Sequence, residues 1–75
     1  MTKYRFLFAR KLHKRQQARL LLIAGYDGET IIWDEKRKNL IGAEMRPDNW
    51  RDFLGRDLTE SEIASCQGMK AMLRP

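Results

Sequence analysis

The sequence predicts an α+β fold, in which a small antiparallel sheet of three to four strands carries the C-terminal helices on one face. Three patterns lead to this prediction. Aromatic and non-aromatic residues alternate near the N-terminus, an Asp-Gly pair separates two apolar runs, and a capping box precedes a helical pattern near the C-terminus. The main alternative is a mostly α fold with a β-hairpin, in which residues 2–24 form one long helix.

A strand is expected over residues 3–9, where Tyr4, Phe6 and Phe8 alternate with other side chains. A period of two places the three rings on one face of a strand. Exposed rings on a sheet offer a platform on which unpaired bases stack. Because a chain this short has a thin core, we expect these rings to be buried instead.

A short helix is expected over 10–18, which lacks Gly, Pro, Asn and β-branched residues. Asp27-Gly28 then lies between two apolar runs, a pattern typical of a tight hairpin turn. We therefore expect paired strands at 19–26 and 29–34.

Residues 19–25 have a second interpretation, because short apolar runs fit a strand or a helix. The helix would then continue to Ala24, with Gly25 as its C-terminal cap. Leu21 and Leu22 disfavour this version, since they would lie on the basic face of the helix.

The second half of the chain suggests one more strand and two helices. The strand is expected at 40–45, after a polar loop. Asp48 is the expected N-cap of a helix over 49–54 that Gly55 ends. Thr59 and Glu62 form a capping box, and the helix that they open is expected to run over 60–72.

The predicted core takes one or two apolar residues from each element. Its members are Tyr4, Phe6, Leu22, Ile32, Ile41, Phe53, Ile63 and Leu73.

The 75 residues predict a single small domain, 1–75, and limit its chemistry. Cys66 and His13 are the only residues of their kinds, so neither a disulfide within the chain nor a metal or other cofactor is expected. No nucleophile has a nearby base, and we expect the protein not to be an enzyme. The thin core makes a homodimer an open alternative.

The chain is expected to be cytoplasmic. Its N-terminus lacks a long apolar run with a cleavage site, so no signal peptide is predicted. The longest apolar run, 20–24, is far too short to span a membrane.

Charge is distributed unevenly along the sequence. Residues 1–26 contain seven basic residues and no acid, whereas the remaining residues contain eight basic and ten acidic ones. This asymmetry indicates a negatively charged partner. The partner is a nucleic acid, DNA or RNA, or alternatively an acidic protein surface.

The leading hypothesis is a small basic nucleic-acid-binding protein with an accessory or regulatory role. Lys and Arg side chains on a helix and in a loop would neutralise backbone phosphates. The candidate nucleic-acid-binding residues are Arg10, Lys11, Lys14, Arg15, Arg19, Lys36, Arg37 and Lys38.

The alternative hypothesis is a protein–protein interaction module. It would be an inhibitor or adaptor of a larger complex, of the kind that mobile elements encode. Trp33 and Trp50 are the candidate interface residues, because exposed Trp side chains are enriched at interaction hot spots.

Overall fold

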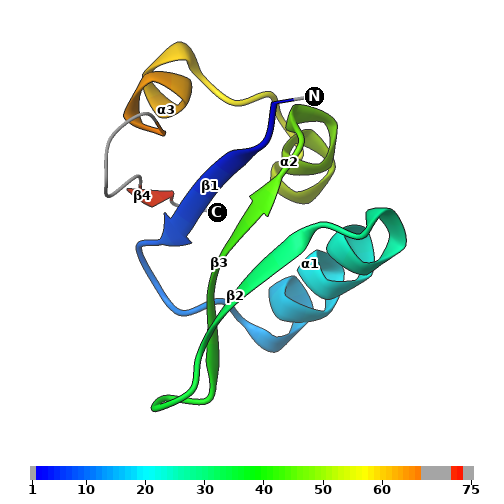
Figure 1. Cartoon of the computed structure of the whole chain (residues 1–75), viewed down its shortest axis with the longest axis vertical. Helices are drawn as coiled ribbons and strands as arrows, with labels where there is room; N and C mark the ends of the chain where they lie inside the picture. The colour runs from blue at the N-terminus through cyan, green and yellow to red at the C-terminus, as the bar shows by residue number, and fades with distance from the viewer. Residues whose placement is uncertain (1, 67–71, 74–75) are drawn as a thin grey trace.

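The computed structural model describes residues 2–66 and 72–73 and confirms the α+β class. Its elements are β1 (Tyr4–Phe8), α1 (Lys14–Asp27), β2 (Thr30–Asp34), β3 (Asn39–Met45), α2 (Pro47–Leu54), α3 (Glu60–Ser65) and β4 (Met72–Leu73). The sheet has the order β2-β3-β1-β4, antiparallel except for β4, which is parallel to β1. Figure 1 shows α1 and α2 together along one side of the strands.

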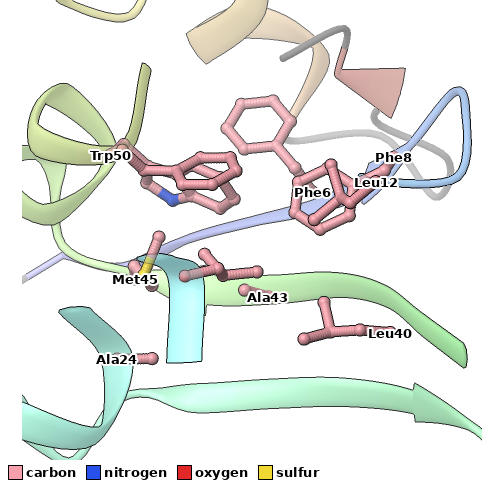
Figure 2. Packing of buried hydrophobic residues seen from close by; sticks show 10 residues of the cluster. Phe6, Phe8, Leu12, Ala24, Leu40, Ala43, Met45 and Trp50 are labelled. Carbon is pink, nitrogen blue, oxygen red and sulfur yellow. The ribbon is translucent and has the colours of Figure 1, made fainter. Parts of the chain in front are cut away.

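Trp50 of α2 lies at the centre of the core and is fully buried. Its ring contacts Phe6 edge-on, with centroids 5.2 Å apart, and lies 6.2 Å from the ring of Phe8 (Figure 2). The indole Nε1–H donates a hydrogen bond to the carbonyl of Tyr4 at 2.9 Å. The aromatic face of β1 is therefore core, as expected, and its rings are not a base-stacking platform.

The strand predicted at 19–26 is wrong, because α1 continues through this segment to Asp27. Gly28 ends the helix in the left-handed region at φ 68°, and the next amide, that of Glu29, donates to the carbonyl of Ala24 at 2.8 Å. An Asp-Gly pair serves a hairpin turn and a helix C-terminus equally well, since both need positive φ. The alternative interpretation of residues 19–25 as helix is closer to the structure, although α1 continues beyond Gly25, its expected cap, to Asp27.

The hairpin of the sheet is the one between β2 and β3. Its strands confirm the predictions at 29–34 and 40–45. The carboxylate of Asp34 accepts hydrogen bonds from the backbone N–H groups of Lys36 and Arg37, at 3.0 and 3.3 Å. Lys38 adopts φ 48° at the end of the turn. The tip projects at the bottom of Figure 1.

The helix predicted at 49–54 is present as α2, but it starts earlier. Arg46 is its N-cap, Pro47 occupies the first turn, and the predicted cap Asp48 lies inside that turn. Proline favours this position because its missing N–H has no partner at a helix start. Gly55, at φ 74°, ends the helix as predicted.

The capping box of Thr59 and Glu62 opens α3 as predicted, yet the helix ends at Ser65. The prediction of a helix over 60–72 is therefore too long: 67–71 lie outside the described residues, and Met72–Leu73 form β4. Met72 and Leu73 instead pair with Leu7 and Phe8 at the edge of β1, which supplies partners for their backbone groups.

The predicted core is correct for Phe6 and Phe53 and wrong for Leu22, which is 73% exposed. A strand at 19–26 would have pointed Leu22 inward. In a helix, the inward face instead carries Leu20 and Ala24, which are both buried.

The remaining core predictions are correct only in part. Tyr4, Ile32, Ile41 and Ile63 are half-buried, and the side chain of Leu73 lies outside the description. In β3 a register shift opposite Ile32/Trp33 turns Leu40 inward in place of Ile41. Phe8, expected to be buried with the aromatic face of β1, belongs to the core as well. The other buried residues outside the predicted list are Leu12, Leu20, Ala24, Leu40, Ala43, Met45 and Trp50.

Glu29 is a buried carboxylate at the junction of α1 and β2, with its side chain 1% exposed. It forms a 3.0 Å ion pair with Lys3 and accepts hydrogen bonds from the backbone N–H of Arg46 and from Asn49 Nδ2. Burial by itself raises the pKa of Glu29, but these hydrogen bonds outweigh it, and the pKa lies below its ordinary value.

Replacement of Glu29 by Gln is expected to lower the free energy of unfolding at pH 7 by about 1–3 kcal/mol. Because the folded-state pKa is lowered, the carboxylate stabilises the fold above its unfolded-state pKa and loses this contribution as the pH falls through the folded-state value. The difference between the two proteins should therefore shrink below about pH 4. Urea unfolding across pH measures it, with the exposed Glu35→Gln as control. A difference that stays constant with pH would contradict this role.

Gly42 of β3 is expected to tolerate no side chain, because a Cβ there would lie 2.3 Å from the carbonyl oxygen of Phe6. We expect Gly42→Ala to destabilise the fold by about 2 kcal/mol or more. Gly25→Ala is the matched control, since a Cβ on this helical glycine meets nothing within 4 Å. It should stabilise α1 by about 0.5–1 kcal/mol. Equal effects of the two changes in thermal unfolding would refute the close approach.

Candidate nucleic-acid interface

A pocket of about 480 Å³ opens where the start of α1 meets the tip of the hairpin. We call it the basic pocket, and its lining residues are Lys11, Leu12, His13, Lys14, Gln17 and Lys38. Three of the predicted nucleic-acid-binding residues thus converge from two segments that are far apart in sequence.

The loop before α1 is held by apolar burial and by two glutamines. Leu12 is buried in the core and anchors the loop. The side chain of Gln17 donates to the carbonyl of Leu12 at 2.9 Å, and the side chain of Gln16 accepts from the backbone N–H of His13 at 2.9 Å. These bonds leave Lys11 and Lys14 exposed on either side of the anchored residue.

Lys38 reaches the pocket because Asp34 ties down the turn. The other two basic residues of the turn, Lys36 and Arg37, are exposed at the tip and do not line the pocket. Arg37 Nε lies 3.7 Å from the carboxylate of Asp34, so part of its charge is offset within the turn.

The start of α1 is strongly electropositive. Its first turn contains no acid, and Lys14 and Arg15 stand there instead. The first backbone N–H groups of a helix lack intrahelical acceptors and form the positive end of its dipole. Within 2–66 and 72–73, no carboxylate forms an ion pair with Lys11, Lys14 or Lys38. An anion is therefore the ligand that this arrangement favours.

Arg19 does not belong to the basic pocket. Its guanidinium donates to the carbonyls of Phe53 and Asp52, at 2.5 and 3.3 Å, and lies 5.6 Å from the centroid of the Phe53 ring. It thus caps the C-terminal end of α2, where a cation is favourable. Arg10 and Arg15 are exposed but do not line the pocket.

The two tryptophans lie in different environments. Trp50 is fully buried and cannot be an exposed interface residue, whereas Trp33 on the edge strand β2 is 50% exposed. Sequence reasoning missed another exposed group, Leu21, Leu22 and Tyr26 on α1, because it assigned this segment to a strand. A helical period applied through Tyr26 would have found it.

The comparisons with known proteins leave the geometry as the basis for function. No family model matches the chain, and no match is found among the curated proteins or the solved structures. In the described part of the chain, no helix is long and apolar enough to cross a membrane. The same residues contain no cluster of three or more His, Cys, Asp and Glu side chains placed to hold a metal ion.

Replacement of Arg19 by Ala is expected to act on stability rather than on ligand binding. It removes two hydrogen bonds and a cation–π contact to α2, so we expect the free energy of unfolding to fall by about 1–2 kcal/mol. Arg15→Ala removes an equal charge one turn away and should change stability by less than about 0.5 kcal/mol. Chemical denaturation of both variants tests this, and equal losses would show that Arg19 has no special structural role.

Proposed function

We propose that the protein binds nucleic acid, with the basic pocket receiving a backbone phosphate. The observation that carries the proposal is the convergence of Lys11 and Lys14 with Lys38 on one pocket at the start of α1. Arg10, Lys36 and Arg37 are exposed on the same two segments and add charge for neighbouring phosphates.

The pocket residues favour binding that is independent of sequence. Lysine ammonium groups are compact point charges, which attract phosphate without the two-pronged geometry that arginine uses to read guanine. Contacts to phosphate position a protein on nucleic acid but carry no sequence information. We therefore assign an accessory role, with affinity that depends on counterion release.

An acidic protein surface is the competing polyanion. Two features favour phosphate. The lysines surround a pocket rather than lie along a flat face, and the pocket opens at a helix start, where free N–H groups suit a compact anion.

The test is a titration of labelled duplex DNA, single-stranded DNA and structured RNA across a salt series. For duplex DNA, Lys38→Gln should lower the slope of log affinity against log salt concentration by about 0.9 if this lysine neutralises one phosphate. Arg5→Gln removes one charge from the face of the sheet opposite the aromatic core, and it should leave the slope unchanged. The triple replacement of Lys11, Lys14 and Lys38 by Gln should lower the slope by about 2–3.

Two results would overturn the proposal. The first is that the unmodified protein binds none of the three nucleic acids at moderate salt, and an acidic protein partner then becomes the leading hypothesis. Equal losses of slope for Lys38→Gln and Arg5→Gln would mean that general positive charge, rather than the pocket, attracts the ligand.

A further inference from the structure

The flank of α1 away from the hairpin carries a second hollow, a groove of about 400 Å³ between α1 and α2. We call it the α1–α2 groove, and it is lined by Leu22, Ile23, Tyr26, Asp27, Asn49 and Asp52. Its floor is apolar, and two carboxylates stand at its rim.

Leu22 and Tyr26 stand one helical turn apart and are 73% and 90% exposed. Residues four apart lie on the same face of a helix, so these two form a continuous apolar strip. Ala18 precedes Leu22 by one turn and is also exposed. A contiguous exposed apolar strip of this kind marks an interaction surface, because it contributes nothing to the core of the isolated chain.

The charge at the start of α1 is the reverse of the one that its dipole favours. The first turn holds Lys14 and Arg15 with no acid. The last turn ends in Asp27, whose carboxylate forms a 2.7 Å ion pair with Arg46. Asp52 at the groove rim forms no ion pair within 2–66 and 72–73. Helices are stabilised by acids at the start and bases at the end. A second copy with α1 running antiparallel would bring the carboxylate of Asp52 at its groove toward the basic start.

We propose that two copies of this chain pair through antiparallel α1 helices, about a two-fold axis near Leu22. In that register, residues equally far from Leu22 face each other, so the ring of Tyr26 packs over Ala18 of the second copy. Arg15 lies roughly 10 Å along the helix from the axis, and Asp27 about 8 Å. Each Arg15 therefore lies toward the groove rim of the other copy, where Asp52 has no ion-pair partner among residues 2–66 and 72–73.

The surface fits itself better than it fits an unrelated partner. It combines a small residue, a large residue and a basic start along one helix with the carboxylate of Asp52 at the groove rim, in the order that a two-fold axis requires. One helix and its flanks make an interface at the low end of the usual size range, so we expect a weak dimer with a micromolar dissociation constant.

The pairing does not depend on nucleic-acid binding and leaves the basic pocket open. Lys14 faces the hairpin side of α1, where it lines the pocket with Lys38, whereas Leu22 and Tyr26 line the groove beside α2. The two pockets of a dimer would be about 24 Å apart along the helix direction, since Lys14 precedes Leu22 by eight residues.

Sedimentation equilibrium of the full chain, from low to high micromolar concentration and without nucleic acid, tests the pairing. The unmodified protein should pass from monomer to dimer, and Leu22→Asp should stay monomeric. Because Leu22 is exposed, an unchanged circular dichroism spectrum of this variant would show that it still folds.

A charge exchange tests the register. Arg15→Asp and Asp52→Arg should each weaken the dimer by about tenfold, because each places like charges together across the axis. The double variant should regain most of the affinity, since the pair is then reversed rather than lost. A monomeric unmodified protein, a dimer that survives Leu22→Asp, or a double variant as weak as the single ones would overturn the proposal.

Discussion

The buried carboxylate of Glu29 joins the segments on which the rest of the fold depends. It follows the end of α1 directly, and it binds Lys3 ahead of β1, the backbone of Arg46 after β3, and Asn49 in α2. A buried charge must keep its partners, because an unpaired one costs far more than the pair contributes. This requirement sets α2 beside α1, and α2 in turn brings Trp50 over the aromatic face of β1.

Two surfaces follow from the placement of α1. Its hairpin flank carries the basic pocket, and its α2 flank carries an apolar groove with an acidic rim. The basic start of α1 opposes the helix dipole, whereas Asp27 in the last turn is neutralised by its ion pair with Arg46. The cost is offset if an anion occupies the start of the helix and a second α1 lies along its outer face.

Arg19 shows why a list of basic residues is an incomplete description of a binding site. A guanidinium is satisfied by phosphate oxygens or by the carbonyls at a helix end, and sequence does not distinguish these acceptors. In the folded chain, Arg19 lies on the carbonyls of α2, whereas Lys38 reaches the basic pocket from a loop. Trp50 is a similar case, since only packing distinguishes a core anchor from an exposed contact.

Local signals in the sequence were enough to predict three strands, the capping box of Thr59 and the end of α2 at Gly55. Each of these features depends on residues that are close together in the chain. The same local reading located most of the basic charge along the chain. Whether residues 19–27 form a strand or a helix was decided only by the tertiary structure, because an Asp-Gly pair fits both a hairpin and a helix end. Burial of Leu20 and Ala24 against the sheet selects the helix. The basic pocket required the tertiary structure too, because Lys14 and Lys38 meet only when the hairpin folds back beside α1.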